Sequence, residues 1–267
     1  MYPHIKHETD QPILNVKNLS VKFSGQFALE DLTFHLHAGE RVAVVGPNGA
    51  GKSTLFKVIA GVLNPTSGEV SVFGSSSGKH ICIAYIPQRS QVDWHFPVNV
   101  SDVVMMGRTA KMKPFSLPGK HNRDIVKRAL DTVDMQDLAC RQISQLSGGQ
   151  QQRMFIARAL AQEAELMLMD EPLSGLDDPA QESLLLLMRK LQQEKVTIMT
   201  ATHDLDQAAQ YFDRIMLLNQ HLIKFGSSKE VLTAENLKLA YGGRLRFVDD
   251  SQSLIALDNS CCDGGDE

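Results

Sequence analysis

The sequence predicts an α/β fold built on a mainly parallel β-sheet, with a small antiparallel β subdomain and a helical insertion. Short apolar runs typical of buried strands alternate with stretches of helical spacing, the pattern of a doubly wound parallel sheet. One predicted strand, Arg41 to Val45, leads directly into a glycine-rich loop and then a helix. The 267 residues suffice for one large domain carrying a subdomain, or for two small domains.

The first predicted elements are short strands and one helix. Residues 13 to 37 alternate apolar and polar positions in runs broken by Ser24-Gly25, which indicates the antiparallel sheet. The helix after the glycine-rich loop carries Leu55 and Val58 on one face and ends at Asn64-Pro65. Further strands are predicted at Val70 to Phe73 and Ile81 to Ile86, with a turn at residues 75 to 78 between them.

The middle of the chain is predicted to be helical, because Ile125, Val126 and Ala129 begin an apolar stripe. We expect residues 89 to 161 to form a helical insertion. A strand at Leu166 to Asp170, a helix at Pro179 to Gln193 and a strand at Thr197 to Ala201 follow. The main domain is predicted to span residues 13 to 245, and residues 246 to 267 a polar, flexible tail.

Composition narrows the class of protein. No stretch approaches the roughly 20 apolar residues that a membrane span requires. The start of the chain lacks the apolar core of a signal peptide, so we expect a cytoplasmic location. The net charge of −4 gives no basic field for a nucleic-acid backbone, which excludes nucleic acid as an expected partner.

The cysteines and histidines give no support for a resident metal site. Four cysteines are too few for a disulfide framework, and Cys82 falls in a predicted buried strand. Cys261 and Cys262 are adjacent in an acidic tail, which favours disorder over a metal-binding pair. The pairs His4 with His7 and His35 with His37 lack a carboxylate or thiol at ligand spacing, so we reject them as ligands.

The glycine-rich loop has the spacing of a phosphate-binding loop. In that pattern, backbone N–H groups point at phosphate oxygens and the following helix adds its positive end. Lys52 is predicted to pair with the β and γ phosphates, and the Ser53 hydroxyl to bind Mg²⁺. The predicted nucleotide-binding residues are Gly46, Pro47, Asn48, Gly49, Ala50, Gly51, Lys52, Ser53 and Thr54.

Two carboxylates end the predicted strand at residues 166 to 170. Asp170 would be costly there unless it meets a positive group such as Mg²⁺. Glu171 follows it and is predicted to orient or deprotonate the attacking water. Two surface acids at a strand end are the alternative, which the apolar run leading into both disfavours.

A second anion site is predicted at Ser147, Gly148, Gly149 and Gln150, which we call the signature residues. Ser147 and two bare amides begin a helix with an apolar stripe, so they form a helix start suited to phosphate. A flexible turn is the alternative for such a Ser-Gly-Gly run.

The phosphate loop, the signature residues and Leu168-Met169-Asp170-Glu171 together resemble the ATP-binding subunit of ABC transporters, with matching motifs from about Phe23 to His203. The resemblance implies an ABC-type P-loop ATPase that uses ATP and Mg²⁺. It also implies that two copies pack head to tail. The signature residues of one copy would then close over the ATP of the other, where they stabilise charge on the γ-phosphoryl oxygens.

The resemblance also assigns roles to single residues. His203 is expected at the γ-phosphate, and it follows a strand that should lie beside the Asp170 strand. Gln88 matches the glutamine that senses Mg²⁺ and the attacking water, and Asp177 is expected at the dimer seam. Phe23 stands where the family places an aromatic residue, usually Tyr, against adenine; a core Phe is the alternative.

The resemblance implies a separate membrane permease, which the helical insertion would contact at the cytoplasmic face of the membrane. An extracytoplasmic substrate-binding protein would be an indirect partner. The runs Pro87 to Val98 and Asp102 to Arg108 resemble ATPases of the manganese, zinc and iron uptake group. Trp94 and Phe96 either line the permease groove or belong to the subdomain core.

Other functions stay open at this stage. The substrate could instead be a siderophore, haem or cobalamin. A soluble ABC ATPase of DNA repair or translation would be expected to carry a coiled coil, a second cassette or a basic surface. A small-molecule phosphotransferase shares the glycine loop but has no use for the signature residues.

Overall fold

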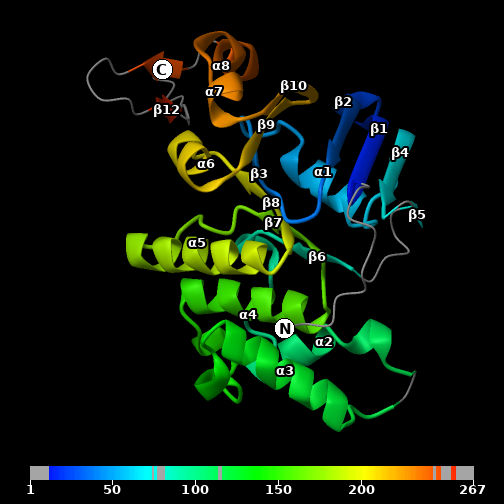
Figure 1. Cartoon of the computed structure of the whole chain (residues 1–267), viewed down its shortest axis with the longest axis vertical. Helices are drawn as coiled ribbons and strands as arrows, with labels where there is room; N and C mark the ends of the chain where they lie inside the picture. The colour runs from blue at the N-terminus through cyan, green and yellow to red at the C-terminus, as the bar shows by residue number, and fades with distance from the viewer. Residues whose placement is uncertain are drawn as a thin grey trace, which may run out of the picture.

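A computed structural model of the chain describes residues 12–73, 75–76, 82–113, 116–242, 245–247 and 254–256. Its centre is a six-stranded sheet of order β10-β9-β3-β8-β7-β6 (Figure 1). All neighbouring pairs are parallel except β10 with β9, so the predicted mainly parallel sheet is confirmed. The strands are β3 (Arg41–Val45), β6 (Ile83–Ile86), β7 (Leu166–Asp170), β8 (Thr197–Thr202), β9 (Arg214–Asn219) and β10 (His221–Gly226).

A four-stranded antiparallel sheet of order β2-β1-β4-β5 forms the predicted β subdomain. The two residues Ser75–Ser76, expected in a turn, pair with β4 instead and form β5. Helix α1 (Lys52–Ile59) lies between this sheet and the larger one (Figure 1). The other strands are β1 (Leu14–Phe23), β2 (Gln26–Leu36) and β4 (Ser67–Val72).

Helices fill the chain between β6 and β7, as the predicted insertion requires. They form a stack on one side of the large sheet (Figure 1). Helix α4 contacts α2, α3, α5 and β6, so it joins the insertion to the sheet. The helices are α2 (Val100–Met106), α3 (Lys120–Thr132) and α4 (Gly148–Ala161), with 3₁₀ turns η1 (Arg89–Gln91), η2 (Thr109–Lys111), η3 (Gln136–Leu138) and η4 (Ile143–Gln145).

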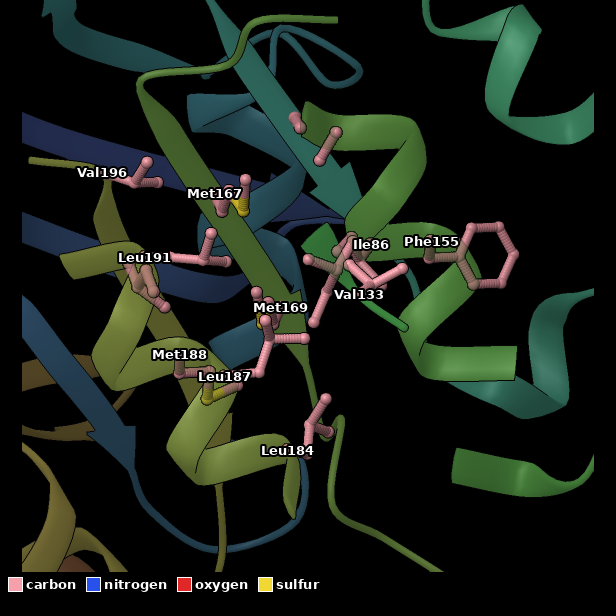
Figure 2. Close-up of a cluster of buried hydrophobic side chains, with 14 of the residues drawn as sticks. Ile86, Val133, Phe155, Met167, Met169, Leu184, Leu187, Met188, Leu191 and Val196 are labelled. Atoms are coloured by element: carbon pink, nitrogen blue, oxygen red, sulfur yellow. The ribbon is translucent and has the colours of Figure 1, made fainter. Parts of the chain in front are cut away.

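Alternate residues of the buried strands face two different cores, because side chains in a strand point to opposite faces. Val42 and Val44 of β3 pack with the β subdomain and α1. Ala43 and Val45 pack with the helical side. Figure 2 shows the second core, where Met167 and Met169 of β7 face apolar side chains of helix α5 (Asp178–Gln193).

Side chains at the helix starts fix where these helices begin. Ser147 accepts from the backbone N–H of Gln150, whose side chain accepts from the backbone N–H of Ser147. This reciprocal pair is a capping box and confirms the predicted start of α4. Asn99 and Asp102 form the same box at α2. Pro179 lies in the first turn of α5, where its missing N–H costs nothing.

The chain beyond β8 adds elements that the sequence did not predict. β9 pairs in parallel with β3, and β10 pairs antiparallel with β9 at the edge of the sheet. These elements are followed by a short strand pair in the region expected to be a polar tail; the rest of that tail lies outside the described residues. The bounds are α6 (Leu205–Tyr211), α7 (Ser228–Val231), α8 (Ala234–Tyr241), β11 (Leu245–Phe247) and β12 (Leu254–Ala256).

Membrane-spanning helices were sought among the described residues. None of the helices there has both the length and the apolar character needed to cross a bilayer.

Candidate functional site

The predicted site residues gather at one edge of the large sheet. β6, β7, β8 and β3 are parallel neighbours, so their carboxyl ends meet. Gln88 follows β6, Asp170 ends β7 with Glu171 directly after it, and His203 follows β8. The glycine-rich loop leaves β3 at the same edge. The expectation that the His203 strand lies beside the Asp170 strand is therefore confirmed.

The loop between β3 and α1 is folded tightly enough to require glycine at two positions. A side chain on Gly46 would overlap the carbonyl oxygen of Leu218 in β9. Gly51 has φ of +96°, a conformation that side chains disfavour. The buried ammonium of Lys52 donates to the carbonyls of Gly46 at 2.7 Å and Pro47 at 3.0 Å. The loop is therefore shaped around the Lys52 ammonium.

Burial lowers the pKa of Lys52, and the carboxylates of Glu171 and Asp170 oppose this shift. A partly desolvated ammonium gains more from an anionic ligand than an exposed one does. The position of Lys52 is therefore suited to pairing with phosphate oxygens.

Asp170 is a buried carboxylate held by two hydroxyl groups. Tyr85 donates to it from β6 at 3.3 Å, and Ser53 hydrogen-bonds it from the first turn of α1. Burial raises the pKa of Asp170, while the hydrogen bond with Ser53 opposes the shift. A buried carboxylate beside a hydroxyl supplies the hard oxygen donors that Mg²⁺ prefers. The residues present therefore fit this ion.

Glu171 has an unusual backbone conformation and two side-chain partners. Its φ of +49° is in the left-handed region, which is costly for a residue with a side chain and is found at functional sites. Gln88 donates from Nε2 to Oε2 of Glu171 at 3.0 Å. Nδ1 of His203 lies 3.9 Å from Oε1, a separation of an ion pair. Each oxygen of the carboxylate therefore has its own side-chain partner.

The charges of Glu171 and His203 stabilise each other. Contact with His203 lowers the pKa of Glu171, while burial opposes this effect. Contact with Glu171 raises the pKa of His203, again against burial. The His203 side chain is 65% exposed, so it is accessible to a ligand from solvent. Glu171 is thus held as a carboxylate, the form needed to accept a proton.

The signature residues line a separate cavity of about 600 Å³. Asp177, at the start of α5, lines the same cavity. A Cβ on Gly148 would lie 2.8 Å from the end of the Leu176 side chain, so a larger residue there would force this side chain to shift. Neither Lys52 nor Asp170 lines this cavity. Within one chain the signature residues and the phosphate loop are therefore two distinct sites.

The aromatic residues singled out in the sequence differ in exposure. Phe23, at the end of β1, is 52% exposed, so the alternative of a core Phe is wrong. Trp94 packs edge-on against Phe155 of α4 at 5.7 Å, and its indole donates to the carbonyl of Arg89 at 3.1 Å. Phe96 is 56% exposed. Trp94 therefore belongs in part to the subdomain core, whereas Phe96 is available at the surface.

Trp94 also borders the edge of the large sheet where the predicted site residues gather. A cavity of about 410 Å³ is lined by both Trp94 and Glu171. The helical insertion and the sheet edge therefore share one depression in the surface.

Two residues of this region were missed from the sequence. Tyr85 contacts Asp170 across the β6–β7 pair, and Arg89 lies against Gly148 of the signature. Only the strand register places Tyr85 there, and Gly148 is far from Arg89 along the chain. The sequence offers no local signal for either contact.

Of the histidines and cysteines considered as metal ligands, the structure describes only His35 and His37. His35 lies near the end of β2 and His37 directly follows the strand, with the two rings edge-to-face at 5.3 Å. Within the described parts of the chain, no three His, Cys, Asp or Glu side chains gather as a metal cluster. His4, His7, Cys261 and Cys262 lie outside the described residues.

Cys82, which was expected in a buried strand, lies just before β6 and is partly buried. Burial raises the pKa of its thiol to about 11.

Comparison with known proteins gives one family. The model of the ABC transporter family matches residues 29–174. The manganese transport system ATP-binding protein MntB of Bacillus subtilis is 42% identical over 89% of this chain and 95% of its own length. The zinc transport system ATP-binding protein TroB of Treponema pallidum is 43% identical over 87% of this chain and 88% of its own.

A further relative and a solved structure agree with this family. The chelated iron transport system membrane protein YfeB of Yersinia pestis is 40% identical over 93% of this chain and 86% of its own. A structure described as an inward-facing metal-chelate type ABC transporter superposes with a TM-score of 0.78. It is 32% identical and covers 92% of this chain and 96% of its own.

Proposed function

The chain belongs to the ABC transporter family, and from this premise we propose that it powers uptake of a divalent metal or metal chelate through a separate permease. It is an ATP-binding subunit that hydrolyses ATP. Relatives named for manganese, zinc and chelated iron transport support the substrate class. Manganese, zinc and iron are therefore the substrates to test.

One observation carries the catalytic part of the proposal: Glu171 is held as a carboxylate by Gln88 and His203 at the edge where the phosphate loop begins. Lys52 would pair with the β and γ phosphates, and His203 would contact the γ-phosphate. Glu171 would orient the attacking water or accept its proton. Mg²⁺ held by Ser53 and Asp170, with Gln88 nearby, would neutralise charge on the phosphate oxygens.

We also propose that two copies pack head to tail. The signature cavity is separate from the phosphate loop of the same chain, so the backbone amides of Gly148 and Gly149 in it would meet the ATP of another copy. Asp177 lines that cavity and would lie at the seam. The exposed ring of Phe23 would stack on adenine. Donors supplied by a partner stabilise the transferring phosphoryl group only after closure, which would tie hydrolysis to dimer formation.

The permease would dock on the helical side. The exposed ring of Phe96 and the depression beside Trp94 support this face as the contact. The chain would then lie at the cytoplasmic face of the membrane. An extracytoplasmic substrate-binding protein would deliver the metal to the permease, and the metal would not pass through this chain.

Isolation from membranes and reconstitution test this function. The tagged chain should co-purify with an integral membrane protein, and vesicles carrying the complex should take up radioactive manganese, zinc or iron when ATP is present. The Glu171→Gln complex is the matched control and should show no uptake. Uptake of cobalamin or haem and not of metal would overturn the substrate proposal. Co-purification with only soluble partners would overturn the transport role.

A further inference from the structure

Arg89 connects the site at the sheet edge with the start of α4. Its guanidinium lies against Gly148, the first residue of α4: a Cβ on Gly148 would be 3.0 Å from Nη1 of Arg89. Gln88, the preceding residue, donates to the Glu171 carboxylate. Two consecutive side chains therefore contact the proposed catalytic carboxylate and the signature residues.

The backbone of this segment is itself anchored to α4. Arg89 begins η1, and its carbonyl oxygen accepts the indole N–H of Trp94. The ring of Trp94 packs edge-on against Phe155 in the middle of α4. A displacement of Gln88 would therefore strain its own bond with Glu171 and also the contacts of Trp94 with Arg89 and with α4.

Further contacts join α4 to β6, the strand that leads to Gln88. Arg158 donates to the carbonyl of Tyr85 at 3.2 Å, and Gln162 donates to the carbonyl of Ile83 at 2.7 Å. These bonds hold the middle and the end of α4, whereas Arg89 reaches its first residue. A helix with contacts along its length moves as a rigid element, and such elements carry coupling between sites.

The charge of Arg89 makes its contact sensitive to phosphate. A cation at a helix N-terminus is repelled by the positive end of the helix dipole. A phosphate group against the amides of Gly148 and Gly149 would relieve that repulsion. Arg89 would therefore favour the closed arrangement in which nucleotide occupies the signature.

We propose that Arg89 is a positioning residue that couples the hydrolysis site of one copy, through Gln88, to the signature that closes over the ATP of the second copy. This inference rests on the proposed head-to-tail dimer. It makes hydrolysis at the two sites interdependent, because each chain senses its own γ-phosphate at Gln88 and presents its signature to the other. Such coupling is measured as cooperativity in the dependence of rate on ATP.

The test uses the complete transporter in lipid vesicles. The Arg89→Ala complex should lose about fivefold to tenfold in kcat, and its Hill coefficient for ATP should fall from about 2 to about 1. The Kd of the separate Arg89→Ala subunit for a fluorescent ATP analogue should stay within about twofold of the wild-type value, because the proposed coupling acts only when a second copy supplies its signature residues. Arg89→Lys should recover part of both losses. Arg128→Ala, an exposed arginine of α3, is the matched control and should change neither.

Several results would overturn the coupling. These are a wild-type complex without cooperativity, an Arg89→Ala complex with the wild-type Hill coefficient, or an Arg89→Lys complex no better than Arg89→Ala. If Arg89→Ala does not assemble, Arg89→Gln replaces it, since it keeps the length of the side chain without its charge. Hydrolysis by the wild type and its loss in Glu171→Gln test the proposed function separately, so failure of one proposal is distinguishable from failure of the other.

Discussion

The side-chain amide of Gln88 donates a 3.0 Å hydrogen bond to the carboxylate of Glu171, which joins the end of β6 to the end of β7. Gln88 lies two residues beyond β6 and Glu171 one residue beyond β7, and these strands are adjacent and parallel, so the pairing of the strands brings the two side chains together. It places the start of the helical insertion one hydrogen bond from the proposed catalytic base. A movement of the insertion can therefore reach the proposed site of hydrolysis directly.

Replacing Glu171 with Gln should abolish turnover while leaving nucleotide binding intact. The amide keeps the size of the side chain but cannot accept a proton, so we expect a loss of about 10²- to 10⁴-fold in kcat. Phosphate release measures kcat, and size-exclusion chromatography with MgATP should show a trapped dimer. A near-normal rate would remove Glu171 from the mechanism.

Replacing Lys52 with Ala should weaken nucleotide binding. The variant would lack the charge-assisted bond between the Lys52 ammonium and the phosphate oxygens. Such a bond is worth about 1.5–3 kcal/mol, which corresponds to a Kd for ATP raised about 10- to 150-fold. Equilibrium titration with a fluorescent ATP analogue measures this change. Lys57→Ala in the same helix is the matched control and should bind as the wild type does. Unchanged binding in Lys52→Ala would contradict its role at the phosphates.

Replacing Phe96 with Ala should weaken the complex with the permease without unfolding the subunit. Phe96 is 56% exposed, so we expect a change of less than about 1 kcal/mol in the free energy of unfolding. A buried aromatic anchor in an interface would cost about tenfold or more in affinity. Co-purification measures the association. Leu186→Ala, 60% exposed on α5, is the control, and equal effects of both variants would show that Phe96 is no specific contact.

The pair of Glu171 and His203 predicts a pH window for stability. The pKa of His203 is raised from 6.5, so its contribution is full below pH 6.5 and is lost as pH rises through the raised value. The pKa of Glu171 is lowered from 4.5, so its contribution is full above pH 4.5 and is lost as pH falls through the lowered value. The pair therefore stabilises the fold most between pH 4.5 and pH 6.5.

His203→Gln provides the measurement for this window. Its deficit in Tm relative to the wild type should be largest between these two pH values and should shrink at alkaline pH. Because the His203 side chain is 65% exposed, the effect should be small. A deficit that grows with rising pH would contradict the charged pair.

Much of the central fold was predictable because its signals are local. Arg41–Val45 and Leu166–Asp170 are short apolar runs that end at chemical motifs, and the structure gives strands with these same bounds. Only the neighbourhood of β7 and β8 was expected; the rest of the strand order was not predictable, because neighbours such as β3 and β9 are far apart along the chain. β9 and β10 were missed although β9 is also a short apolar run, because no chemical motif follows it as one follows β3 and β7.

The residues of the proposed site were likewise predictable where their signal is local, and not where they depend on packing. The glycine-rich loop and the signature residues have fixed spacing in the sequence, so they could be named before the structure was known. The bond from Tyr85 to Asp170 and the contact of Arg89 with Gly148 depend on how distant segments pack. For Trp94 the sequence offered either a surface groove or the subdomain core. The side chain borders a cavity and also packs on the core, so the two alternatives do not exclude each other.

The order of the large sheet determines which part of the chain can exist as an independent unit. The two neighbours of β3 are β8 and β9, and both follow residue 174, where the match to the family ends. A fragment cut at that point would keep every glycine of the phosphate loop but leave both sides of the strand beneath it without hydrogen-bond partners. Shortened versions intended for screening or crystallisation must therefore extend beyond Asn219.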